Sequence, residues 1–326
     1  MQLFNGTLRC LLRAAHRPGK YAAHLSAAAA ATATRAPQQQ QQWQRHYSLS
    51  ADPAPIAMAY EMFETPNTDT NKPPLMIMHG LFGSKQNWRS VGRAIASKTN
   101  RRVFTVDLRN HGDSPHANTH NSAGMTADIK TFLAANGISK VSLMGHSMGG
   151  RASMHFSLYN TQLVERLIVV DISPVSMPRT LDEMNSIMLG MQEVVLPSNI
   201  PLSEARQRAK QHLLKTVAAD SVDFIMLNLR KRPDTGEFHW ACNVDVLRSS
   251  LNGFLNYGRN IHNKGPFLGP ATFICGSHSP YMNPDDWPEV LHFFPNANLH
   301  WLETGHLVHL EKPHDFIKLT TDFLNS

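Results

Sequence analysis

The stretch KVSLMGHSMGGRASMHF, which begins at residue 140, constrains the fold of this chain most strongly. Its apolar start, residues 141–144, is typical of a strand, and the residues that follow Gly149 are typical of a helix. Ser147 lies at the junction, with Gly145 two residues before it and Gly149 two residues after it. In such a tight turn larger side chains at both glycine positions would collide, and the serine hydroxyl is lifted clear of the backbone. The pattern therefore predicts a nucleophilic serine in a strained strand-to-helix turn.

Strand-like and helix-like segments alternate from residue 55 onward. Short apolar runs predict strands at residues 55–63, 74–80, 101–109, 140–147, 164–173, 270–279 and 298–306. Helical segments fall between several of them, at residues 86–97, 125–136, 149–159 and 315–324. Continuous apolar runs are typical of parallel strands that are covered on both faces. The order of segments therefore predicts an α/β fold, with a mostly parallel sheet flanked by helices.

The interval 174–269 departs from this alternation. It carries almost no strand signal, and three of its stretches are typical of helices: LDEMNSIMLGMQEVV, SEARQRAKQHLLKTV and DVLRSSLNGFLNYG. Met184, Met188 and Met191 share one helical face, a pattern that suits core packing or the wall of an apolar pocket. We therefore predict a core formed by residues 48–173 and 270–326, with residues 174–269 inserted as a helical cap.

The first 47 residues have the composition of a targeting segment. They contain six of the basic residues and no Asp or Glu, and these six cations account for the whole formal charge of +6. The rest of the chain is formally neutral, which removes the reason to expect a nucleic-acid partner. Basic, acid-free sequences rich in Ala, Ser and Thr are typical of transit peptides. We expect residues 1–47 to be a mitochondrial transit peptide that is cleaved near Ser48, although a low-complexity tail has a similar composition.

Other features narrow the class of protein further. No later segment has the roughly 18 consecutive apolar residues of a membrane span. Cys242 and Cys275 are far apart in sequence, and neither lies in a metal-binding spacing, so we expect both to be buried small apolar residues. His111, His116 and His120 gather in one loop without regular spacing, and Asp113 is the only acidic residue that accompanies them. We therefore expect no metal site.

A nucleophilic serine needs a base and donors for the oxyanion. His306, in WLETGHLVHLEKP, lies directly after the last predicted strand and is the preferred base, with His309 as its competitor. The backbone N–H of Met148 and one from the loop that begins at His79 are the expected oxyanion donors, and Leu81 is the preferred second donor. Gly80 and Gly83 allow that loop to turn toward a ligand.

At this point the chain resembles the alpha/beta-hydrolase superfamily over residues 55–325, in the order of its motifs as well as in their content. HGLFGSKQNW, VDLRNHGDSP, MGHSMGG and VDISPV are similar to the mitochondrial alpha/beta-hydrolase domain-containing protein 11 group, which is described as diacylglycerol-lipase-like, and to bacterial esterases. The resemblance implies the alpha/beta-hydrolase fold with its helical cap inserted after the sixth strand. It also implies a carboxylester hydrolase that uses no cofactor.

Three positions compete for the acid that orients His306. The usual position in this superfamily follows the penultimate strand, but Ser279 occupies it, and Asp285 and Asp286 come later. Asp171 ends the strand LIVVD, as in the bacterial relatives, whereas the acid of the subfamily is commonly assigned at an N-x-D that corresponds to Asp245. Either residue could instead cap a turn or a helix. A strand end is more rigid than a cap, so we prefer Asp171.

Two hypotheses of function follow. In the first, Ser147, His306 and Asp171 hydrolyse an acyl ester through an acyl-enzyme in the mitochondrial matrix. The resemblance implies diacylglycerol as the substrate, and a short acyl ester or a thioester fits the residues equally well. In the second, the protein binds acyl chains or acts as a chaperone without catalysis. The complete serine and histidine motifs argue for the first hypothesis.

Overall fold

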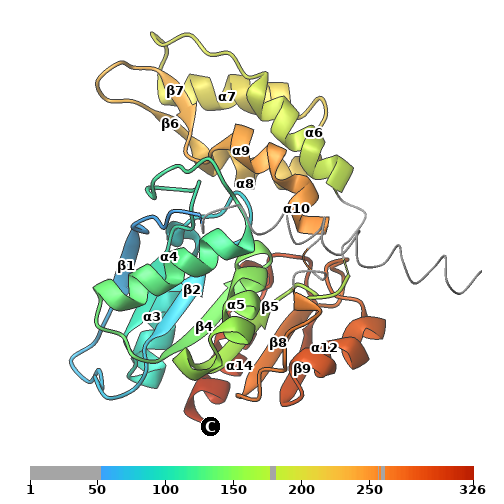
Figure 1. Ribbon diagram of the computed structural model, residues 1–326. Coiled ribbons are helices and arrows are strands. Elements are labelled where there is room, and N and C mark those ends of the chain that lie inside the picture. Colours follow the sequence, from blue (N-terminus) through green and yellow to red (C-terminus); the bar gives the residue numbers. More distant parts are fainter. Residues whose placement is uncertain (1–52, 177–180, 256, 258–260) are drawn as a thin grey trace, which may run out of the picture. The chain divides into compact units, whose positions relative to one another are not determined.

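The computed structural model describes residues 53–176, 181–255, 257 and 261–326 (Figure 1). The segment predicted as a transit peptide lies outside the described residues, so that assignment stays a prediction. No helix within the described ranges is both long and apolar enough to cross a membrane.

A seven-stranded sheet forms the centre of the core, with the strand order β1-β3-β2-β4-β5-β8-β9. Its strands are β1 (Tyr60–Phe63), β2 (Leu75–Met78), β3 (Val103–Val106), β4 (Val141–His146), β5 (Val164–Val170), β8 (Ala271–Gly276) and β9 (Ala297–Leu302). β1 pairs antiparallel to β3, and all other pairings are parallel, so the predicted fold class is confirmed. His146 pairs with Val170 and Val170 with Ile274. The residues that follow these strands therefore meet at one edge of the sheet.

Helices cover both faces of the sheet because alternate strand residues point to opposite sides. Met76 and Met78 pack in a cluster with residues of α4 (Ser122–Ala135) and α5 (Met148–Tyr159). Leu75 and Ile77 pack with α3 (Arg89–Thr99) and α14 (Pro313–Asn325). The remaining core helices are short: α12 (Trp287–Phe293), α13 (Val308–Glu311), and the 3₁₀ turns η1 (Lys85–Trp88), η2 (Thr161–Leu163) and η4 (Pro284–Asp286).

Local sequence signals set several helix ends. The Asn121 side chain accepts a hydrogen bond from Gly124 N at 2.8 Å and caps α4. Asn100 adopts a left-handed conformation, with φ 54°, at the end of α3. Pro313 occupies the first turn of α14, where its missing N–H costs nothing.

The cap lies between β5 and β8. It therefore follows the fifth strand in chain order, whereas the resemblance implied that it would follow the sixth. The residues themselves predicted five strands before the cap, and five are found. The first of them begins only at Tyr60, because residues 53–59 form no strand. Their backbone donors bond to side chains: Ile56 N donates to Asp128 Oδ1, and Ala59 N donates to Ser114 Oγ, both at 2.8 Å.

The described part of the cap is helical, as predicted, and also contains a small hairpin. Its helices are α6 (Leu181–Gln192), α7 (Leu202–Leu213), α8 (Ala219–Ile225), η3 (Met226–Asn228), α9 (Val244–Ser249) and α10 (Leu251–Leu255). The hairpin pairs β6 (Leu229–Lys231) with β7 (Phe238–Trp240), and no pattern in the sequence predicted it. Met188 and Met191 are buried in the core of the cap. Met184 is only partly buried and faces a cavity.

Candidate active site

Ser147 lies in a strained turn between β4 and α5. Its backbone has φ 51° and ψ −113°, and its N–H donates to Val170 O at 3.0 Å. A Cβ added at Gly145 would collide with the carbonyl of Gly149, and one added at Gly149 would lie 2.5 Å from Met78 O. The two glycines therefore allow α5 to begin directly against the strands. A backbone in this conformation stores on the order of 1–3 kcal/mol, and strain of this kind is concentrated at functional sites.

Asp171 follows β5 and faces His306. Its side chain is fully buried, and His306 Nδ1 donates to Asp171 Oδ2 at 2.6 Å. Gly276 N donates to the other carboxylate oxygen at 2.9 Å, and the Ser279 hydroxyl donates to Oδ2. The carboxylate is therefore held by donors on three sides, and the bond to the histidine leaves Nε2 as the ring nitrogen that can accept a proton.

The turn that carries His306 is fixed by its neighbours. Gly305 N donates to Glu311 Oε2 at 2.8 Å, and His146 Nε2 donates to His306 O at 2.9 Å. The ring of Tyr281 stacks on the His306 ring, with a centroid distance of 3.8 Å and an interplanar angle of 20°. Both faces of the turn are thus in contact with side chains that the sequence did not single out.

The competing candidates lie elsewhere. His309 is buried and stacks on Trp88, with ring centroids 3.9 Å apart, and burial lowers the pKa of His309 to about 3. Such a histidine stays neutral and has no access to the serine. Asp245 is exposed on α9, where it accepts a hydrogen bond from the Gln192 amide. The structure therefore does not bring Asp245 to His306, and Asp286 instead accepts a hydrogen bond from the Ser176 hydroxyl.

The loop after β2 approaches the serine closely. A Cβ added at Gly80 would lie 2.7 Å from His146 Nδ1 and 3.3 Å from Ser147 Cβ, so only glycine permits this approach. His79 Nδ1 donates to Gly80 O at 2.7 Å, and its Nε2 accepts from Leu108 N at 3.0 Å. Both ring nitrogens of His79 are thus engaged, and burial lowers its pKa, which keeps the ring neutral.

A small space lies beside Ser147, and Leu81, Met148 and Arg151 are among the residues that line it. Its volume is about 20 Å³, which is enough for one oxygen atom or one water molecule. Met148 is the first residue of α5, so its N–H is one of the donors that a helix leaves free at its start. The two residues predicted to supply oxyanion donors therefore border a space of the right size.

A larger cavity of about 550 Å³ contains Ser147 and His306. Its walls are mostly apolar, and the cap contributes Met184, Ile187, Phe224 and Ile225. Glu183 and Glu311 are the carboxylates among the described residues that line it, and no Lys or Arg is among them. The cavity therefore suits an uncharged ligand with a substantial apolar part.

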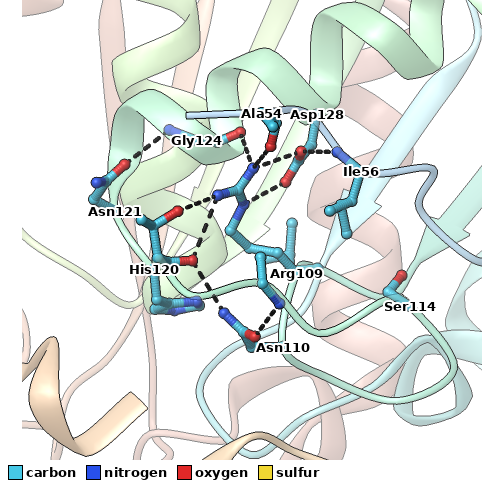
Figure 2. A network of polar contacts seen from close by, with 12 residues as sticks. Ala54, Ile56, Arg109, Asn110, Ser114, His120, Asn121, Gly124 and Asp128 are labelled. Atoms are coloured by element: carbon cyan, nitrogen blue, oxygen red, sulfur yellow. Dashed lines mark hydrogen bonds and ion pairs between the residues drawn. The ribbon is translucent and has the colours of Figure 1, made fainter. Parts of the chain in front are cut away.

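The loop that follows β3 holds a network of polar contacts around Arg109 (Figure 2). Arg109 is fully buried and donates to both carboxylate oxygens of Asp128, at 2.7 and 2.8 Å. Figure 2 shows that the same guanidinium reaches the carbonyl oxygens of Ala54 and Gly124. His120, in the same loop, places Nε2 3.1 Å from the sulfur of Met148. The network thereby fixes a residue that packs against an expected oxyanion donor.

Ion pairs connect this loop to the cap. Lys85 Nζ bonds to Asp107 Oδ2 at 2.6 Å and also to Asp113. Arg230, on β6, bonds to Asp113 at 2.5 Å. Burial opposes the charge of Lys85, but its bonds to Asp107 and Asp113 outweigh that effect and raise its pKa. The cap hairpin is therefore tied to the core through a chain of charged groups.

Known proteins share this fold and much of this sequence. The profile of a family described as "alpha/beta hydrolase fold" matches residues 73–313. The "sn-1-specific diacylglycerol lipase ABHD11" of Xenopus tropicalis is 39% identical over 274 residues, which cover 83% of each chain. The protein of the same name from Danio rerio is 37% identical over 273 residues, again 83% of each chain. A solved structure, "Marine microorganism esterase", has a TM-score of 0.71 and 28% identity, and it covers 82% of this chain and 99% of its own.

Proposed function

This chain belongs to the alpha/beta-hydrolase fold family, and from that premise we propose that it hydrolyses carboxylic esters through Ser147, His306 and Asp171. The class of hydrolase, a lipase or esterase of the serine type, follows from the relatives. The observation that supports the specific residues is their arrangement. Ser147 and His306 line one cavity, while Asp171 holds the far ring nitrogen of His306.

The first half of the reaction forms an acyl-enzyme. Ser147 Oγ attacks the ester carbonyl carbon while His306 Nε2 takes the hydroxyl proton. The carbonyl oxygen becomes an oxyanion, which the 20 Å³ space beside Leu81 and Met148 can hold against two backbone N–H groups. When the tetrahedral intermediate collapses, the C–O bond to the alcohol breaks, and His306 returns the proton to the departing alkoxide.

The second half of the reaction releases the acid. A water molecule gives one proton to His306 and attacks the acyl carbon, and the C–O bond to Ser147 then breaks. The proton returns to Ser147 Oγ, and the fatty acid leaves. In both halves Asp171 orients the imidazole and stabilises the imidazolium, and it does not take the proton itself.

We propose a neutral acyl ester as the substrate, with diacylglycerol as the leading candidate. Relatives are named as diacylglycerol lipases. The apolar cavity with Glu183 and Glu311 in its lining would repel anionic esters such as acyl-CoA thioesters or phosphatidate. This second argument comes from the residues of this chain alone.

A substrate panel on the purified protein tests the proposal. We expect diacylglycerol and other neutral esters to be hydrolysed with a kcat/KM at least tenfold above that for acyl-CoA or phosphatidate of equal chain length. Ser147→Ala should remove all turnover and leave the melting temperature close to that of the wild type. A wild-type protein that binds diacylglycerol without hydrolysing any ester would support the alternative, a binding or chaperone-like protein on this fold.

A further inference from the structure

One loop provides most of the contacts that hold Asp171 and His306 together. It follows β8, and two of its residues touch the pair: Ser279 donates to the carboxylate of Asp171, and Tyr281 stacks on His306. Gly276, the last residue of β8, donates to the same carboxylate. Ser279 stands where many members of this fold carry the acid. In this chain that position carries a hydroxyl donor, and an aromatic ring follows it two residues later.

The hydrogen bond to Asp171 fixes only part of the orientation of His306. A single bond at Nδ1 sets the tautomer and the direction of one ring nitrogen, but it allows the ring plane to rotate about that bond. The ring of Tyr281 lies nearly parallel to the imidazole, at a centroid distance of 3.8 Å. The ring of His146 is farther away, at 4.5 Å, and is tilted by 41°. Tyr281 is thus the ring that sets the plane of the imidazole and the direction of Nε2.

Tyr281 is itself anchored to the strand that carries the acid. Its carbonyl oxygen accepts a hydrogen bond from Ser173 N at 2.8 Å, two residues after Asp171. Its N–H donates to Ser279 Oγ at 3.3 Å, and this hydroxyl donates to Asp171. The Tyr281 ring and the Asp171 carboxylate are therefore connected by hydrogen bonds, so a displacement of one shifts the position of the other.

We propose that Tyr281 is a positioning residue for His306, and this inference rests on the proposed ester hydrolysis. Its ring holds Nε2 in the direction of Ser147. Its π-face also stabilises the imidazolium that forms each time the histidine takes a proton, because a cation is attracted to the face of an aromatic ring. Both roles belong to the aromatic ring, so we expect a phenylalanine to keep them.

Two substitutions separate the ring from the hydroxyl. Tyr281→Leu keeps an apolar side chain and removes the ring, and we expect kcat to fall about tenfold while KM changes by less than about twofold. Tyr281→Phe keeps the ring, and we expect its kcat to lie within about twofold of the wild type. An unchanged kcat in Tyr281→Leu, or a tenfold loss in Tyr281→Phe, would overturn the inference.

NMR spectroscopy detects the stacking of Tyr281 on His306 without a measurement of turnover. Signals of the His306 ring protons, assigned by comparison with His306→Gln, should lie upfield in the wild type because of the ring current of Tyr281. The shift should persist in Tyr281→Phe and disappear in Tyr281→Leu. Its absence from the wild type would contradict the inference even if no variant folded well. An upfield shift in a wild-type protein that hydrolyses no ester would instead count against the proposed function and leave the stacking intact.

Discussion

Single residues decide how the proposed triad is assembled. Asp171 has an unusual backbone, with φ 51°, and its buried carboxylate accepts from Gly276, Ser279 and His306. Asp245, in contrast, is exposed and bonds to Gln192. Donors around a buried carboxylate hold its oxygens in place, and a carboxylate held in this way can orient the ring of a histidine partner. The geometry therefore supports Asp171 over Asp245 as the orienting acid of the proposed triad.

Asn at these two positions gives a direct comparison. We expect Asp171→Asn to lower kcat by about 10⁴-fold, because the amide favours the wrong tautomer of His306 and removes the charge that stabilises the imidazolium. Asp245→Asn serves as the matched control and should stay within about twofold of the wild type. Steady-state kinetics on a neutral ester measures both values. The reverse result, a large loss in Asp245→Asn only, would show that the acid belongs to the cap.

The sequence predicted some of these residues and not others, for a physical reason. Ser147 and His306 are identified by local patterns, because each directly follows a strand. The acid was ambiguous because every candidate carboxylate lies between the serine and the histidine in chain order. Only the register of β4, β5 and β8 places one of them beside the histidine. Tyr281 carried no pattern, since stacking depends on a loop conformation that no short motif specifies.

At the scale of elements, the close crossing of α5 over the strands explains the glycines around Ser147. A Cβ at Gly149 would lie 2.5 Å from Met78 O and 2.6 Å from His79 O. Both are backbone atoms, one at the end of β2 and one at the start of the loop that follows it, and the sheet restricts their movement. The start of α5 can therefore pack this closely against the end of β2 only because residue 149 is a glycine.

A substitution at Gly149 tests this dependence. We expect Gly149→Ala to lower the free energy of unfolding by about 1–3 kcal/mol, as overpacking in a tight core does. Gly253→Ala is the control, because a Cβ there meets nothing within 4 Å and the residue lies in helix α10. That change should be neutral or stabilise by up to about 1 kcal/mol. Urea denaturation gives both values. Equal free energies of unfolding for the two variants would contradict the close packing of α5 against the end of β2.

Elements were predictable where their burial was uniform. The core strands β2, β3, β4 and β8 are buried along their whole length, and continuous apolar runs marked them in the sequence. The cap hairpin was missed because β6 and β7 have three residues each and are mostly half-buried, so neither an apolar run nor a strict alternation could form. The order of core elements was therefore correct, while the cap was described only by its helices.

At the scale of the whole molecule, buried histidines couple stability to pH. Burial lowers the pKa of His309 to about 3 and that of His155 to about 4, and burial together with the charge of Arg109 lowers that of His120 to about 3. In the unfolded chain these histidines titrate near pH 6.5. Below that pH the unfolded state binds more protons than the folded state, so acid favours unfolding.

The free energy of unfolding should therefore be highest above about pH 6.5 and fall progressively toward pH 3. At pH 5 each of these histidines should lower the free energy of unfolding by about 2 kcal/mol relative to its value well above pH 6.5. His309→Phe keeps a ring against Trp88 and removes one titrating group, so its loss between pH 7 and pH 5 should be smaller by about that amount. Urea denaturation at the two pH values measures the difference. An identical loss of unfolding free energy in the wild type and in His309→Phe would contradict the claim that His309 couples stability to pH.

The covalent state of Ser147 tests the central claim most directly. A fluorophosphonate probe phosphonylates a serine only when a base has activated it, and peptide mass spectrometry locates the adduct. We predict an adduct on the peptide that contains Ser147 in the wild type, no adduct in Ser147→Ala, and labelling at least 100-fold slower in His306→Ala. An adduct on another residue, or labelling of His306→Ala at the wild-type rate, would contradict a serine nucleophile activated by His306.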